Sequence, residues 1–274
     1  MTVSPGARSA LRPVDAGPQA VHAGTEPIIV RAGSGLPGMS IGSASALAAG
    51  KKNEDFHGVA RQGPGDLAAR GFAIALADGV SGSGSGRVAA EAAVRAVLDD
   101  YYAMPHDWDA ARALDRALCA INEWLFAANA RSPEGDGAVC ALSVLVFAGS
   151  GYRLAHVGDT RVYRLRETQL RLLTTDHVWP RCDMRHVLRR AVGLDTHLVV
   201  DYTRGELAAG DTFVMLSDGV WEVLGDVGLR ELLERNADPQ RAAEALIASA
   251  LQRQAQYMGR NDATALVARI VELA

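Results

Sequence analysis

The stretches AIALADGV (residues 73–80) and FVMLSDGV (residues 213–220) follow one pattern, in which an apolar run of strand length ends in Asp-Gly. A short apolar run bounded by turn residues is typical of a buried β-strand, and glycine lets the backbone turn sharply after it. The pattern therefore predicts two buried strands that each end in a turn. Asp78 and Asp218 are thereby placed at the rim of a rigid sheet.

Further carboxylates stand beside predicted strands elsewhere in the chain. Asp159 lies between two strand patterns in AHVGDTRVY (155–163), and Asp262 precedes one in RNDATALV (260–267). KKNEDF (51–56) adds Glu54 and Asp55. We expect these side chains to converge at one end of a sandwich of sheets.

A cluster of carboxylates repels itself, and each member raises the pKa of the next. Divalent cations neutralise such a cluster, and an all-oxygen set of ligands selects hard ions such as Mg²⁺ or Mn²⁺. Two such ions suit in-line attack on phosphorus. The alternative is structural, because Asp-Gly is also an ordinary turn and aspartate is common at the start of a helix.

The remaining pattern predicts an α+β fold. Strands follow one another through tight turns, which favours antiparallel sheets, and the helices come in blocks that pack outside those sheets. The expected strands are 39–46, 71–77, 140–147, 152–157, 161–165, 197–202, 212–216 and 263–271, and the expected helices are 88–102, 109–130 and 239–258. Residues 1–37, rich in Pro, Gly and Ala, are predicted to be a mobile leader with a short strand at 28–31, followed by a single domain over 38–274.

Composition excludes several classes of protein. The 274 residues include 32 acidic and 28 basic side chains, so the net charge is −4, which disfavours a nucleic-acid protein that relies on excess positive charge. The sequence has neither an apolar stretch long enough to span a membrane nor the pattern of a secretory signal. Three widely spaced cysteines fit reduced thiols, so we expect a cytoplasmic location.

Several motifs occur in one order from about residue 40 to the C-terminus. They are NED (53–55), ADGV (77–80), VGDTRVYRL (157–165), TTDH (174–177), LRRAVG (188–193), GDTFVMLSDGV (210–220) and RNDATALV (260–267). In this order the chain resembles the metal-dependent type 2C Ser/Thr protein phosphatases. DFHG (55–58), ALADGV (75–80) and LDDYY (98–102) look most like the phosphatase domain of bacterial proteins in which it is fused to a Ser/Thr kinase.

The resemblance implies an α-β-β-α sandwich, in which two packed antiparallel sheets carry helices on both outer faces. It implies two or three Mn²⁺ or Mg²⁺ ions, with Asp78 and Asp218 in the catalytic centre. The implied ligands are Asp78 bridging two metals, the Gly79 carbonyl oxygen, Asp218 and Asp262 on the first metal, Glu54 or Asp55 on the second, and Asp159 on a third.

The implied activity is hydrolysis of phosphoserine and phosphothreonine in proteins by a metal-bound hydroxide, without a phosphoenzyme. The implied partners are a phosphorylated protein substrate and a cognate Ser/Thr kinase. One alternative is a non-catalytic module of the same fold that binds a phosphoprotein or a kinase. Another is a metal hydrolase that acts on a small phosphoester.

The chain departs from the family at the residue that grips the substrate phosphate. The family commonly has arginine four residues before the Glu of NED, where this chain has Gly50. Lys51 and Lys52, the only lysines of the chain, stand next to this position, and a strand would point them to opposite faces. We expect one of them to contact substrate phosphate; the alternatives are two exposed lysines, with Arg61 or Arg161 in that role.

Two further departures are Val80, where animal enzymes have histidine, and a short segment between Asp176 and His197, where the family has a mobile flap. His177 of TTDH has two interpretations. It is either a proton donor to the leaving group or a loop histidine bonded to the backbone, and the second is favoured.

Overall fold

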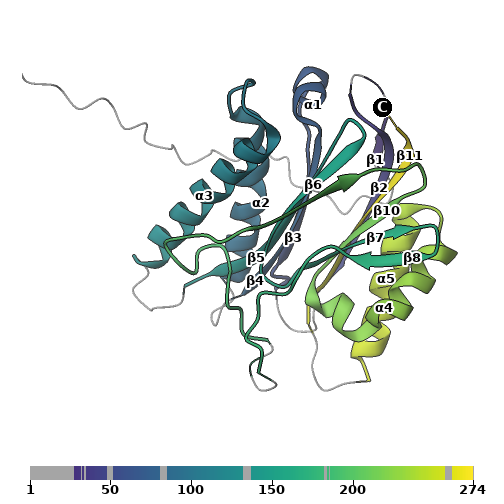
Figure 1. The fold of residues 1–274 in the computed structure, drawn as a ribbon. Helices are drawn as coiled ribbons and strands as arrows, with labels where there is room; N and C mark the ends of the chain where they lie inside the picture. The colour runs from purple at the N-terminus through teal and green to yellow at the C-terminus, as the bar shows by residue number, and fades with distance from the viewer. Residues whose placement is uncertain are drawn as a thin grey trace, which may run out of the picture.

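The computed structural model describes residues 28–31, 33, 35–47, 52–80, 85–131, 137–181, 184, 186–256 and 261–273. Within them, two antiparallel sheets pack face to face, and helices cover the outer face of each sheet (Figure 1). The predicted α-β-β-α sandwich is thus confirmed. None of the described helices has the length and apolar character that crossing a bilayer requires.

The six-stranded sheet has the order β1-β2-β11-β10-β7-β8. Its strands are β1 Ile28–Val30, β2 Gly38–Ala46, β7 Arg161–Arg166, β8 Gln169–Leu172, β10 Thr212–Leu216 and β11 Ala263–Glu272. The five-stranded sheet has the order β3-β4-β5-β6-β9. Its strands are β3 Asp55–Val59, β4 Phe72–Val80, β5 Val139–Ala148, β6 Gly151–Val157 and β9 Asp201–Glu206.

Helices α2 and α3 belong to the side of the five-stranded sheet, and α4 and α5 cover the six-stranded sheet. The helices are α1 Pro64–Arg70, α2 Gly86–Ala103, α3 Ala110–Asn129, α4 Asp218–Arg235 and α5 Pro239–Gln254. Two of them begin at the predicted sites. The Asp109 side chain accepts a hydrogen bond from the amide of Arg112 at the start of α3, and Asp238 does the same for Arg241 at the start of α5.

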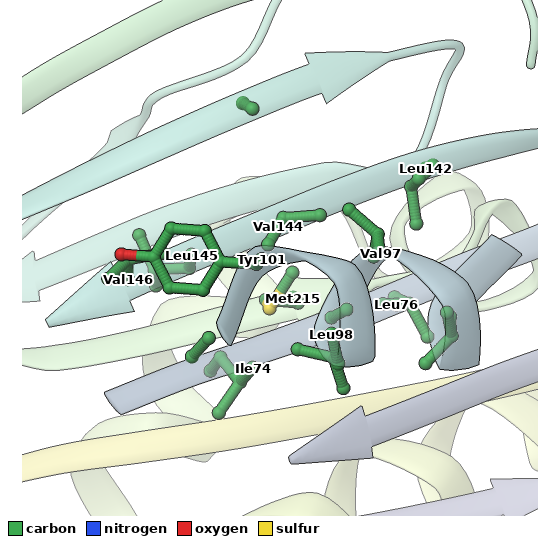
Figure 2. Packing of buried hydrophobic residues seen from close by; sticks show 14 of the residues in the cluster. Ile74, Leu76, Val97, Leu98, Tyr101, Leu142, Val144, Leu145, Val146 and Met215 are labelled. Atoms are coloured by element: carbon green, nitrogen blue, oxygen red, sulfur yellow. The ribbon is translucent and has the colours of Figure 1, made fainter. Parts of the chain in front are cut away.

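The main core fills the space between the sheets and extends under α2 (Figure 2). Strand alternation divides its side chains between two layers. Val144 of β5 faces outward beneath Val97 and Tyr101 of α2, whereas Leu145 faces inward toward Met215 of the other sheet. A second cluster of buried side chains lies between the six-stranded sheet and α4 and α5.

The two Asp-Gly pairs differ from the prediction and from each other. Strand β4 does not turn at Asp78 but continues to Val80, with Asp78 opposite Asp55 of β3. A Cβ at Gly79 would lie 2.2 Å from the carbonyl oxygen of Gly86, so this glycine permits close approach of α2. The second pair opens a helix, because Asp218 is the first residue of α4.

Other elements were missed or misplaced. The expected strand 197–202 begins only at Asp201, and the sequence pattern predicted neither α1, β3, β8 nor α4. Helix α4 carries a kink at Gly225, where φ is 63°, so its apolar spacing is broken. By contrast, the short strand expected at 28–31 is present as β1, where Ile29 pairs with Ser40 of β2; residues 1–27 lie outside the described residues.

Candidate metal centre

The antiparallel pairing brings five aspartates to one end of the sandwich. Asp55 begins β3 and lies opposite Asp78 near the end of β4. Asp159 occupies the turn between β6 and β7, Asp218 follows β10, and Asp262 precedes β11. Because adjacent strands run in opposite directions, the end of one lies beside the start of the next.

The pKa shifts show that four of these side chains interact. Burial, followed by the charges of Asp218, Asp55 and Asp159, raises the pKa of Asp78 well above its usual range. Burial and the charges of Asp159 and Asp55 do the same to Asp218. Burial is also the main reason why the pKa rises to about 6 at Asp55 and to about 7 at Asp159. The predicted convergence of these carboxylates is therefore present.

Ser217 fixes the orientation of Asp55 across the two sheets. Its hydroxyl donates to Asp55 Oδ2 at 2.7 Å, while its Oγ accepts from the amide of Thr264 at 2.9 Å. Ser217 directly precedes Asp218. The same residue thus links β3, β11 and the start of α4.

The segment that contains Glu54 is held from two sides. The Glu54 amide donates to Asp262 Oδ2 at 2.8 Å, and the Gly86 amide donates to Glu54 Oε1 at 3.0 Å. The guanidinium of Arg87 donates to the carbonyl of Asp55 at 2.7 Å and lies 4.7 Å from the ring centroid of Phe56. The N-terminus of α2 and Arg87 thereby position both acidic residues of the Glu54-Asp55 pair.

The turn that carries Asp159 is bound by neighbouring side chains. The Gly158 amide donates to His177 Nδ1 at 3.1 Å, and the Trp221 indole donates to the Asp159 carbonyl at 3.1 Å. Gly158 has a φ of 104°, and a Cβ there would lie 2.3 Å from the Cβ of Ala141. The site therefore requires glycine before this aspartate.

His177 is buried, and the contacts of its two ring nitrogens are defined. Nδ1 accepts from the Gly158 amide, so Nε2 carries the proton of the neutral ring and lies 3.0 Å from Asp201 Oδ2. These contacts match the interpretation of His177 as a loop histidine bonded to the backbone. Both ring nitrogens are thus engaged in contacts within the protein.

Arg161 is committed to structural contacts. Its guanidinium forms a fork on Asp176, with an Nη2–Oδ2 distance of 2.7 Å, and stacks 3.6 Å from the ring centroid of Trp221. Lys52 is exposed, and Lys51 lies outside the described residues. The role of either lysine in phosphate binding stays a prediction.

Glu222 is a member of the site that the sequence reasoning missed. It lies one turn after Asp218 on α4, and its charge contributes to the raised pKa of both Asp159 and Asp218. His186 Nδ1 lies 3.4 Å from its carboxylate. The i, i+4 spacing from Asp218 was the available signal, but it has meaning only once α4 is known to be a helix.

The donor set fits hard divalent cations. Clustered carboxylates whose pKa values are raised by neighbouring carboxylates need positive charge, and they offer only oxygen atoms as ligands. Among the described residues, no three His, Cys, Asp or Glu side chains are arranged to hold one ion unaided. Mg²⁺ in proteins usually binds one or two carboxylates and keeps several waters, so a loose carboxylate cluster suits it.

Comparisons with known proteins agree with this geometry. The profile of the Protein phosphatase 2C family matches residues 43–265. The chain is 30% identical over 215 residues to the serine/threonine protein phosphatase PstP of Mycobacterium tuberculosis, covering 73% of this chain but 40% of PstP. It is 26% identical over 212 residues to the serine/threonine phosphatase stp of Listeria monocytogenes, covering 71% of this chain and 82% of that protein.

A solved structure shows the same similarity. The catalytic domain of PstP in complex with two manganese ions superposes with a TM-score of 0.69 at 27% identity, covering 85% of this chain and 99% of that domain. The chain spans less than half the length of the full PstP protein.

Proposed function

The chain belongs to the protein phosphatase 2C family, and we propose that it removes phosphate from phosphoserine and phosphothreonine residues of proteins with the help of Mn²⁺ or Mg²⁺. The observation that carries the proposal is the meeting of Asp55, Asp78, Asp159 and Asp218 at one end of the sandwich, where loss of solvent contact and the charges of neighbouring carboxylates raise their pKa values. Bound cations would neutralise the negative charge of such a cluster and make it useful for phosphoryl chemistry.

We propose two ion positions and a third, weaker one. Asp78 would serve both of the first two ions and Gly79 would offer its carbonyl oxygen. Asp218 and Asp262 would help to hold the first ion, and Glu54 or Asp55 would help to hold the second, in part through water. Asp159 and Glu222 serve the third, since both lie beside Asp218. When bound, the ions supply positive charge to the phosphoryl oxygens and lower the pKa of a bound water.

The residues of the chain keep this arrangement ready for a phosphoryl group. Ser217 and Arg87 fix Asp55, and His177 and Trp221 fix the turn of Asp159, so little movement is needed when substrate arrives. The phosphoryl group passes directly to water, with no phosphoenzyme. One of Lys51 and Lys52 contacts the substrate phosphate in place of the family arginine.

The proposed partners follow from this chemistry. The substrate is a phosphorylated protein, and the opposing enzyme is a Ser/Thr kinase, so the chain takes part in phosphorylation signalling in the cytoplasm. Gly50, at the position of the family arginine, favours one second candidate, a module that binds phosphoproteins without hydrolysing them. The retained acidic cluster argues for the enzyme.

The test is hydrolysis of p-nitrophenyl phosphate and of a phosphothreonine peptide with Mn²⁺, with EDTA and Asp78→Asn as controls. We expect turnover that requires Mn²⁺ and is lost in both controls. Saturable binding of the phosphopeptide without release of phosphate would instead identify the binding module. Hydrolysis of p-nitrophenyl phosphate alone would point to a small phosphoester as substrate.

A further inference from the structure

Each of the two sheets has an edge strand on the same side of the sandwich. Strand β8 ends the six-stranded sheet, and β9 ends the five-stranded sheet (Figure 1). The two edges meet where the Thr203 hydroxyl of β9 donates to the carbonyl of Leu173, the residue after β8, at 3.4 Å. On this side, no further described strand continues either sheet.

Two arginines lie directly opposite each other on the inner face of the six-stranded sheet. Arg164 of β7 pairs in register with Arg171 of β8 and, on its other side, with Phe213 of β10. Phe213 and Val162 are buried in the core between the sheets, and alternation places Arg164 on the same face as both. Like charges directly opposite on a sheet are destabilising, so this pairing requires compensation.

The described residues supply no compensation for this pair. Neither guanidinium has an ion pair or a side-chain hydrogen bond with any residue in the described ranges. Nε of Arg164 is buried and lacks a partner within the same ranges. The nearby carboxylate of Asp211 is already held by Arg166, with both N–O distances at 2.6 Å.

We propose that Arg164 and Arg171 form a binding site for an oxyanion of the phosphate type. A buried donor without a partner calls for an explanation, and an ion is one that also removes the repulsion between the two charges. The guanidinium fork matches the oxygen geometry of phosphate, and two forks suit a dianion.

The proposed site is separate from the metal centre. Arg164 lies three residues beyond Arg161, the residue that begins β7 beside Asp159. At roughly 3.3 Å per residue this separation is about 10 Å along the strand. An oxyanion bound there does not need the metals. Its binding can therefore be tested independently of the phosphatase activity.

The chain contains a matched control pair. Arg153 of β6 and Arg204 of β9 also lie directly opposite each other, and both are exposed. They stand on the outer face of their sheet, since their neighbours Leu154 and Tyr152 face the core. This pair presents the same two charges without a buried donor.

The experiment is calorimetric titration of inorganic phosphate into the metal-free protein in EDTA at constant ionic strength. We expect one phosphate per chain, with Kd at least tenfold higher in Arg171→Gln and in Arg164→Gln and changed less than twofold in Arg204→Gln. Arg171 is exposed, so its variant keeps the test valid if Arg164→Gln fails to fold.

A second arm repeats the titration with a phosphothreonine peptide. Tighter binding of the peptide than of free phosphate identifies a phosphorylated protein as the source of the oxyanion, and equal or weaker binding identifies the free ion. The proposal is overturned if the metal-free protein binds no phosphate, if Arg171→Gln leaves Kd unchanged, or if Arg204→Gln weakens binding as much as Arg171→Gln does.

Discussion

Asp55→Asn should stabilise the metal-free protein at alkaline pH. Asp55 is 2% exposed, and burial raises the pKa of its carboxyl from 3.8 to about 6. A carboxyl whose pKa is raised by folding destabilises the fold once it is ionised, so the penalty is complete above pH 6 and disappears as the pH falls toward 4. A shift of about two units corresponds to about 3 kcal/mol at pH 8 and to about half of that at pH 5.

The assay is thermal unfolding in EDTA at both pH values. For a domain of this size, about 3 kcal/mol corresponds to a Tm increase of roughly 6–12 °C at pH 8. Asparagine keeps an oxygen that accepts from the Ser217 hydroxyl, so the packing is preserved. Asp107→Asn, at an exposed residue, should leave Tm unchanged. A gain that is equal at both pH values, or a loss of stability at pH 8, would refute the reasoning.

Four other outcomes are expected. Asp78→Asn should abolish phosphopeptide hydrolysis while raising the Tm of the metal-free protein, and near-normal turnover with Mn²⁺ would contradict its bridging role. Asp159→Ala should weaken catalysis and still bind two ions by calorimetry; fewer than two would reject a peripheral third site. Lys52→Ala should raise KM for a phosphopeptide about tenfold, or about 1.4 kcal/mol, if this lysine contacts phosphate; an unchanged KM assigns the role elsewhere. Arg87→Met should weaken Mn²⁺ binding about tenfold, and kcat should recover in excess Mn²⁺. Arg95→Met, which also removes a cation from the ring of Phe56, should leave Mn²⁺ binding unchanged.

The strands of the core could be predicted from the sequence because burial leaves a local signal. Thr212–Leu216 is a continuous apolar run, and the observed β10 has the predicted bounds. Helix α4 left no such signal, since Gly225 interrupts it and changes the direction of its apolar face. Strand β3 was missed because it is short and contains Asp55 and His57, both of which are polar yet buried.

The convergence of the acidic residues was predictable because strand ends in antiparallel sheets share an edge. The local geometry of each residue was not, because it depends on contacts distant in sequence. Asp78-Gly79 and Asp218-Gly219 read alike, but Gly79 is required by the approach of Gly86, whereas Gly219 lies against the Asp262 carbonyl at the start of a helix. The same Asp-Gly dipeptide is thus used for two different steric reasons.

The same distinction applies to the positive charges of the site. Arg161, which follows Asp159 by two residues, was one of the alternative candidates for phosphate binding. The folded chain instead places Asp176 within reach of the Arg161 guanidinium and Trp221 beneath it. The charge of Arg161 is thereby neutralised, and its paired N–H donors are already bonded to Asp176. Arg164, three residues further along, lacks such a partner among the described residues. Which arginine is available to an anion is therefore decided by the strands and helices packed around it, and the sequence of β7 does not contain that information.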